Sequence, residues 1–186
     1  CDKAFSGCTG LEHATISDAK LRHFGKNVLQ GAPLTNGITL RTVEGRFGNL
    51  GAGGIADKVN NVVFIDHKNG IAPKAFAGFT GLTQIDLPDG VTEIEQEAFK
   101  GCSSLTKIKI PDSVKYIIRE AFSECTGLTQ VVVPDGVQEL APDTFTGCSS
   151  LTSITIPDIS IRGWTAKDCP AELTIRVICG NGIRYC

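Results

Sequence analysis

The sequence has no methionine, one tryptophan and two tyrosines, and no apolar run approaching the roughly 18 residues that cross a bilayer. It also lacks an excess of basic residues, because 18 Lys and Arg face 20 Asp and Glu, for a net charge of −2. These absences exclude membrane insertion of this segment and the basic surface typical of a nucleic-acid-binding protein. No basic stretch followed by an apolar one opens the chain. It starts at Cys1, already inside a repeat unit, so we expect a processed chain or a fragment.

A 23-residue repeat occupies residues 76–158. The unit is F-x-x-C-x-x-L-x-x-I-x-I-P-D-x-V-x-x-I-x-x-x-A, in which the apolar positions recur at fixed intervals. Its phenylalanine position is filled by Phe76, Phe99, Phe122 and Phe145. A fixed period of this length indicates a solenoid, and the L-x-x-L-x-L spacing falls within the leucine-rich class.

The spacing within the unit predicts its local structure. The L-x-x-I-x-I segment alternates apolar and polar residues at its end, which is the period of a half-buried strand. Stacked units would then form a parallel sheet with strands about 4.8 Å apart. Pro-Asp pairs are expected to end each strand. The V-x-x-I segment predicts a second inward-facing wall, and A-F-x-x-C predicts a short helical turn that closes the coil.

The chain divides into a solenoid over residues 1–158 and a cysteine-containing cap over residues 159–186. About seven units fit the solenoid, with degenerate repeats over 19–58 and a glycine-rich loop at 45–54. In the second unit Ile38 and Leu40 come one residue late. The pattern stops at Ile159, and solenoids need a cap over the exposed end of the core.

Two segments carry a family resemblance. They are Ala98-Phe99-Lys100-Gly101-Cys102-Ser103-Ser104-Leu105-Thr106 and Leu151-Thr152-Ser153-Ile154-Thr155-Ile156-Pro157-Asp158. They resemble the BspA-like (Treponema pallidum type) leucine-rich repeat, specifically over 71–158 and recognisably at 4–18. The resemblance implies an α/β-type solenoid, a curved right-handed coil with a parallel β-sheet on its concave face. It also implies a secreted or cell-surface protein of a bacterium or microbial eukaryote, engaged in adhesion or binding. The family offers no catalytic motif to transfer.

Cysteine recurs at one position of the unit, as Cys8, Cys102, Cys125 and Cys148. Stacked thiols could bind a metal or form disulfides. However, Phe79 and Gly31 fill the same position elsewhere, and a buried free cysteine packs like a small apolar residue. We therefore predict free thiols at this position. At the C-terminus we expect a disulfide among Cys169, Cys179 and Cys186 if the protein is secreted, with its connectivity open.

Metal binding and catalysis find little support. Aspartate recurs once per unit, as Asp18, Asp66, Asp89, Asp112, Asp135 and Asp158. A calcium loop needs several oxygen ligands close together, so turn formation is the favoured interpretation. The histidines His13, His23 and His67 are scattered, and no HExxH, GxSxG or P-loop spacing occurs. We predict no enzyme, no metal and no cofactor.

The outward strand positions vary while the rest of the unit is constant. They are Gln84/Asp86, Lys107/Lys109, Gln130/Val132 and Ser153/Thr155. In a curved solenoid they would line the concave face. The two lysines form a positive spot suited to a carboxylate or sulfate, and Asp86 could pair with Lys109 across strands.

From this face we predict a non-catalytic recognition or adhesion module that binds a protein or glycan. The alternative is a structural or assembly subunit, in which the array serves as a spacer or stacks end to end. A merely solvated sheet face is an equally good interpretation of the outward positions themselves.

Overall fold

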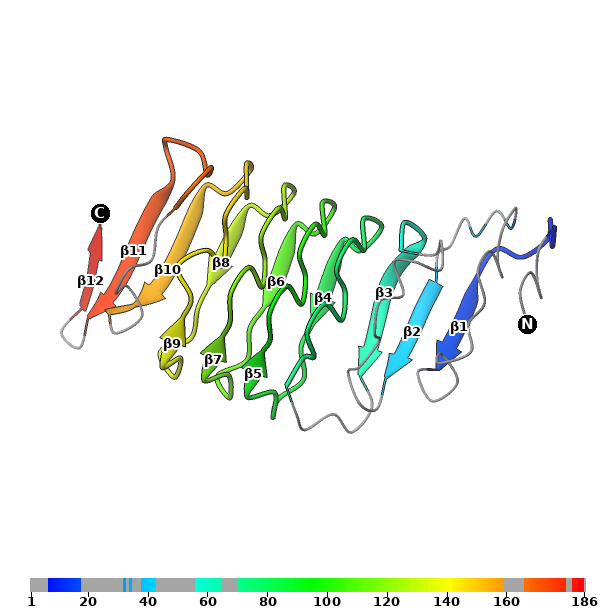
Figure 1. Cartoon of the computed structure of the whole chain (residues 1–186), viewed down its shortest axis with the longest axis horizontal. Helices are drawn as coiled ribbons and strands as arrows, with labels where there is room; N and C mark the ends of the chain where they lie inside the picture. Colours follow the sequence, from blue (N-terminus) through cyan, green and yellow to red (C-terminus); the bar gives the residue numbers. More distant parts are fainter. Residues whose placement is uncertain are drawn as a thin grey trace.

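The computed structural model describes residues 7–17, 32, 34, 38–42, 56–64, 70–158, 166–179 and 182–185. Along the long axis of the molecule, strands follow one another as rungs (Figure 1). They are β1 (Ala14–Ser17), β2 (Ile38–Thr42), β3 (Val59–Phe64), β4 (Gln84–Asp86), β5 (Glu93–Ile94), β6 (Lys107–Lys109), β7 (Tyr116–Ile117), β8 (Gln130–Val132), β9 (Glu139–Leu140), β10 (Ser153–Pro157), β11 (Thr174–Cys179) and β12 (Gly182–Tyr185).

Parallel pairing of equivalent positions organises the sheets. The described strands form one sheet of β1-β2-β3, one of β12-β11-β10-β8-β6-β4 and one of β5-β7-β9. In the six-stranded sheet Gln84 pairs with Lys107, Lys107 with Gln130, and Gln130 with Ser153, each partner one full repeat further along the chain. The predicted parallel stacking of the repeat units is therefore confirmed.

The third sheet is the predicted second wall. Its strands β5, β7 and β9 pair in parallel, again with a shift of one full repeat. Each contributes one fully or almost fully buried residue, Ile94, Ile117 and Leu140 in turn. The coil thus has two β walls that enclose one core.

The N-terminal sheet confirms the late frame of the second unit. Ala14 pairs with Ile38 and Ile16 with Leu40, so the interval between partners is one residue longer than in the later units. Several predicted features lie outside the described residues. They are Gly31, Asp18, Asp66, His23, His67, the loop at 45–54, Cys1 and Cys186. The count of seven units and the curvature and handedness of the coil stay predictions.

The segment that closes each coil is not the predicted helical turn. Around Phe99, the N–H groups of Phe99 and Gly101 donate to the carbonyls of Ala121 and Ser123 in the next unit, both at 2.8 Å. Between them, the N–H of Lys100 donates within its own coil to the carbonyl of Glu97 at 3.1 Å. Because alternate N–H groups bond to the next unit, a continuous i to i−4 ladder cannot form. The described residues contain no α-helix, and the closing segments among them consist of successive turns.

The Pro-Asp pairs lie in turns, as predicted. The valine N–H donates to the proline carbonyl three residues before it in Pro88–Val91, Pro111–Val114 and Pro134–Val137, at 3.3, 3.1 and 3.1 Å. The last repeat differs, because β10 runs through Pro157, which pairs with Ile178 of β11. The ladder to β8 has already ended at Thr155, so the missing N–H of proline interrupts no bond there.

Four stacked phenylalanine rings form the centre of the core. Ring centroids lie 5.1 Å apart for Phe76 and Phe99, 5.2 Å for Phe99 and Phe122, and 5.5 Å for Phe122 and Phe145. Adjacent planes differ by 9° or less, and all four side chains are fully buried. The repeat thus places identical side chains in contact with one another, unit after unit.

The predicted free thiols are present next to this stack. Cys102, Cys125 and Cys148 are buried and free, and each Sγ donates to the carbonyl of the phenylalanine in the preceding coil, at 3.1, 3.1 and 3.2 Å. Burial raises the pKa of Cys148, and contact with the Cys102 thiol, together with burial, raises the pKa of Cys125. Cys8 is also free, but its side chain is exposed.

Cys169 belongs to the same series, which the sequence did not reveal. Its Sγ donates to the carbonyl of Phe145 at 3.3 Å, and the thiol is free. It therefore takes no part in the expected C-terminal disulfide. The Cys179 side chain and Cys186 lie outside the described residues, so a bridge between them stays a prediction. The interval from Cys148 to Cys169 is shorter than one repeat, so Cys169 does not fall at the cysteine position that the repeat predicts.

Part of the proposed cap extends the main sheet. β11 pairs in parallel with β10, and its buried Val177 is the partner of Ile156. β12 then turns back antiparallel to β11. A cap over residues 159–186 stays a proposal, to which the structure adds that its strand β11 continues the parallel stack.

We expect the thiols to fall into two reactive classes. In the native protein at about pH 8, Cys8 should be alkylated at once, whereas Cys102, Cys125 and Cys148 should resist, because burial keeps the reagent from their sulfur atoms. At Cys125 and Cys148 the raised pKa also disfavours the thiolate, which is the nucleophile. In denaturant without reductant, all four should react. Mass mapping after each treatment measures this. A bridge between Cys102 and Cys125, or between Cys125 and Cys148, would contradict the assignment.

Candidate binding face

The outer side of β4, β6 and β8 is an exposed polar face. In each strand the central residue is buried and the residues on both sides are exposed. Gln84, Asp86, Lys107, Lys109, Gln130 and Val132 all lie on this exposed side. Ser153 and Thr155 continue it on β10 and are half-buried. The side chain of Val132 is 60% exposed, the largest value among the described large apolar residues.

The register places these residues in two rows across the strands. One row contains Gln84, Lys107, Gln130 and Ser153. The other row contains two pairs. Asp86 of β4 is paired with Lys109 of β6, and Val132 of β8 is paired with Thr155 of β10. Side chains in a row are about 4.8 Å apart at their backbones. The face therefore presents closely spaced groups of different chemistry on a rigid backbone.

Lys107 and Lys109 have no partner for their ammonium groups among the described residues. The ion pair that the sequence suggested between Asp86 and Lys109 does not form, although the two residues are paired across the strands. Two cations on the same side of one strand repel each other weakly through water. An anion that contacted both would relieve this repulsion.

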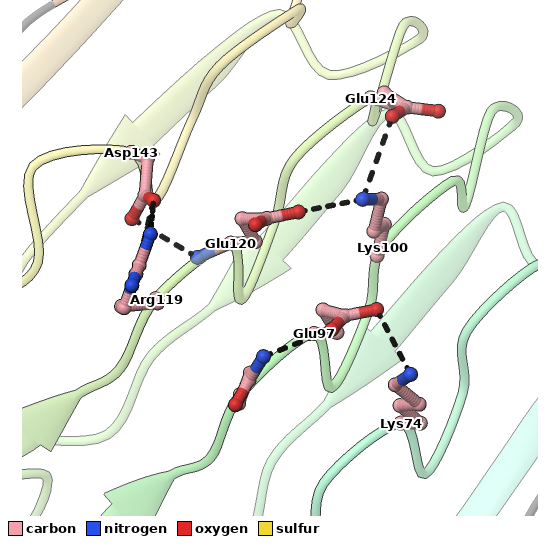
Figure 2. A network of polar contacts seen from close by, with 8 residues as sticks. Lys74, Glu97, Lys100, Arg119, Glu120, Glu124 and Asp143 are labelled. Carbon is pink, nitrogen blue, oxygen red and sulfur yellow. Dashed lines mark hydrogen bonds and ion pairs between the residues drawn. The ribbon is translucent and has the colours of Figure 1, made fainter.

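Three cations on the turns, Lys74, Lys100 and Arg119, are paired with carboxylates. Lys74 pairs with Glu97 at 3.4 Å, and Arg119 with Asp143 at 3.3 Å (Figure 2). Lys100 contacts two carboxylates, those of Glu120 and Glu124. The hydrogen bond with Glu120, aided by its charge, raises the pKa of Lys100, while desolvation opposes the rise.

We call these seven residues the turn network (Lys74, Glu97, Lys100, Arg119, Glu120, Glu124 and Asp143). Its pairs join side chains of neighbouring coils (Figure 2). In addition, the N–H of Glu120 donates to Oδ1 of Asp143 at 3.3 Å. The sequence contained the signal, since positions 74, 97, 120 and 143 are successive repeats of one position and all are charged. The turn network therefore links neighbouring coils through ion pairs, whereas the two lysines of β6 form none with the described residues.

The small sheet of β5, β7 and β9 has an exposed row of its own, which the sequence analysis did not predict. Glu93 of β5, Tyr116 of β7 and Glu139 of β9 are paired across the strands of the small sheet. Tyr116 is 39% exposed, and its hydroxyl donates to Oε1 of Gln138 at 3.1 Å. These residues precede the buried Ile94, Ile117 and Leu140, so alternation within V-x-x-I would have predicted that they face outward.

The described residues contain no cluster of side chains suited to a metal ion. Among them, no three His, Cys, Asp or Glu side chains lie close enough together to hold a metal ion. His13 is exposed and contacts Thr39 Oγ1 at 3.1 Å. The described residues include no helix that could cross a membrane.

The two β walls, the stacked phenylalanine core and the polar outer face define a leucine-rich repeat solenoid. The family model of the BspA type leucine rich repeat region matches residues 56–170 in six copies. That match covers more than half of the sequence, and the chain belongs to this family.

Three solved structures are similar. The Treponema pallidum leucine-rich repeat protein TpLRR is 25% identical with a TM-score of 0.44, over 92% of this chain and 61% of that one. A leucine-rich repeat protein from Bacteroides ovatus is 20% identical with a TM-score of 0.44, over 96% and 63%. A leucine rich cell surface protein from Faecalibacterium prausnitzii is 19% identical with a TM-score of 0.37, over 96% and 62%. The chain spans less than two thirds of each. No curated protein sequence matches it.

Proposed function

We propose that the protein is a non-catalytic recognition or adhesion module, secreted or at the cell surface, that binds an anionic group of a protein or glycan. The binding face is the outer side of β4, β6, β8 and β10, and Lys107 and Lys109 are its centre. The observation that carries the proposal is that two cations without a carboxylate partner in the described part of the chain lie on the same exposed side of one strand. Lys74, Lys100 and Arg119 of the turn network have carboxylate partners, whereas the two lysines of β6 have none among the described residues.

The geometry suits a carboxylate or sulfate. The two lysines extend from one side of β6 with backbones about 6.6 Å apart along the strand. An anion between them would accept charge-assisted hydrogen bonds, which are stronger than those between neutral groups. Val132 on the neighbouring strand offers an exposed apolar contact beside the charges. Gln84 and Gln130 flank Lys107 and can donate or accept hydrogen bonds.

The frame beneath the face supports recognition. Ile85, Ile108 and Val131 anchor the three strands in the core, since their side chains are only 3%, 8% and 2% exposed. A face held this firmly loses little conformational entropy on binding, which favours affinity. Membership of the BspA-type family supports a recognition role and a surface location, and the family offers no catalytic motif that would favour an enzyme.

Charge reversal at Lys107 and Lys109 should weaken binding of anionic probes. We expect the wild type to bind immobilised polyglutamate or a sulfated glycan more weakly as salt rises. The double variant K107E/K109E should bind at least about tenfold more weakly, which corresponds to roughly 1.4 kcal/mol. Binding curves at two salt concentrations, followed by a pull-down from host-cell or matrix extract, measure this.

The matched control is the double variant K58E/K167E, which makes the same change in net charge away from the face. It should bind as the wild type does, and both variants should keep the wild-type melting temperature, since none of these side chains is buried. Equal recovery of the probes by K107E/K109E and the wild type would refute the assignment of this face.

A further inference from the structure

The small sheet carries a patch with the opposite charge. Glu93 and Glu139 flank the exposed ring of Tyr116 on neighbouring strands, and Lys115 is the residue next to Tyr116 in the chain. Among the described residues no ion pair engages the carboxylate of Glu93 or of Glu139. We call Glu93, Tyr116, Glu139 and Lys115 the acidic patch.

The face of the main sheet has the same composition with the signs inverted. Lys107 and Lys109 lie on β6, the exposed Val132 lies on the adjacent strand β8, and Asp86 is paired across the strands with Lys109. We call these four residues the basic patch. Each patch therefore contains two charges of one sign, one charge of the other sign and one exposed apolar side chain. Of the three large apolar residues exposed in the described part of the chain, the two patches hold two, Tyr116 and Val132.

One molecule cannot bring its own two patches together. The basic patch lies on the sheet that contains β4, β6 and β8, and the acidic patch on the separate sheet of β5, β7 and β9. In Figure 1 the strands β5, β7 and β9 follow the lower border of the coil, while β4, β6 and β8 cross its middle. Contact between a basic and an acidic patch therefore needs two molecules.

We propose that the basic patch of one molecule binds the acidic patch of a second copy of the same chain. The inference rests on the proposed function, since it names the partner whose carboxylates Lys107 and Lys109 bind. In the contact, the two lysines meet Glu93 and Glu139, and Val132 packs against the ring of Tyr116.

The dimensions of the two patches are compatible. The lysine backbones are about 6.6 Å apart along one strand, and the glutamate backbones are about 9.6 Å apart across three strands. Lysine stems are long and flexible enough to bridge the difference. The strands of the two copies then cross, because one pair of charges runs along a strand and the other runs across strands.

The contact joins two different surfaces, so it is heterologous. Each copy keeps one unused patch, and further copies add in the same direction to form an open chain or a ring. Contacts between exposed charges are individually weak and are screened by salt. The association is accordingly reversible, concentration-dependent and reduced at high ionic strength.

Sedimentation velocity over a concentration series, from about 10 µM to about 1 mM, tests the contact in the range of weak complexes. We expect the wild type to form dimers and larger species at the upper end, and fewer of them when salt is raised. The variants K107E/K109E and E93K/E139K should each stay monomeric. The control K58E/K167E, with the same change in net charge as K107E/K109E, should associate as the wild type does.

Combining all four reversals in one chain separates a specific contact from a general charge effect. The variant K107E/K109E/E93K/E139K carries both patches with exchanged signs, and it should associate again. An equimolar mixture of the two double variants should do the same. Melting curves of every variant establish that the fold is intact.

Two outcomes would overturn the inference, and both differ from a failure of the proposed function. A wild type that is monomeric at all concentrations but still binds polyglutamate through Lys107 and Lys109 overturns self-association alone. Association that the combined variant fails to restore overturns the pairing of the two patches. If K107E/K109E instead binds polyglutamate as well as the wild type does, the binding face itself is refuted.

Discussion

Replacing Phe122 by alanine is expected to lower the free energy of unfolding by about 3–5 kcal/mol. The ring is fully buried and stacks between those of Phe99 and Phe145, at centroid distances of 5.2 and 5.5 Å. Its removal therefore leaves a cavity between two coils, and both neighbouring rings lose a stacking partner. Because stability in a solenoid depends on contacts between neighbouring units, the loss should weaken the whole array.

Chemical denaturation monitored by circular dichroism measures this effect. Lys109→Ala is the control, and as an exposed change it should shift stability by no more than roughly 0.5 kcal/mol. The two substitutions lie in the same region of the coil but on opposite sides of the sheet. Comparable unfolding midpoints for both would show that the inside and outside of the sheet have been assigned wrongly.

The buried core was predictable because the same residue type recurs at the equivalent position of several repeat units. A single phenylalanine could be exposed, but four that recur at one fixed interval must occupy equivalent places. Leu82, Leu105, Leu128 and Leu151 follow the same rule and are all fully buried. Strand positions followed from alternation, which distinguishes Ile108 from the lysines on either side of it.

The closing segment was not predictable from its own residues. Ala98, Phe99 and Cys102 have a spacing compatible with a helical turn, and nothing local excludes one. The excluding factor is the next unit, whose carbonyls of Ala121 and Ser123 accept alternate N–H groups. A bond between residues of two different coils cannot be read from a pattern within one of them.

The candidate site was predictable only in part. Alternation identified the outward residues, yet the absence of an ion pair between Asp86 and Lys109 depends on side-chain positions that the sequence does not fix. Cys169 was not predicted because its spacing departs from the repeat. Tyr116 was not predicted because the prediction for the second wall covered its inward residues alone. For the ion pair and for Cys169, the missing information was the arrangement of neighbouring coils relative to one another. For Tyr116, alternation within V-x-x-I contained the signal.

The second large effect on stability is expected at Gly127, where two coils approach each other closely. A Cβ on Gly127 would lie 2.5 Å from the carbonyl oxygen of Ser103, in the preceding coil, well inside contact distance. The nearest atoms belong to backbone, so they cannot rotate away as a side chain would. Gly127→Ala should therefore force the coils apart locally and cost about 1–3 kcal/mol, the range of overpacking in a well-packed interior.

Gly10→Ala is the matched control, because Gly10 precedes Leu11 as Gly127 precedes Leu128. No described atom lies within 4 Å of a Cβ at Gly10, so this change should leave stability within roughly 0.5 kcal/mol of the wild type. Ser104, at the same position of another unit, indicates that a coil built around a Cβ is possible. If Gly127→Ala unfolds at the same denaturant concentration as Gly10→Ala, the neighbouring coil yields without cost. The close contact at Ser103 would then contribute nothing to the spacing of the repeats.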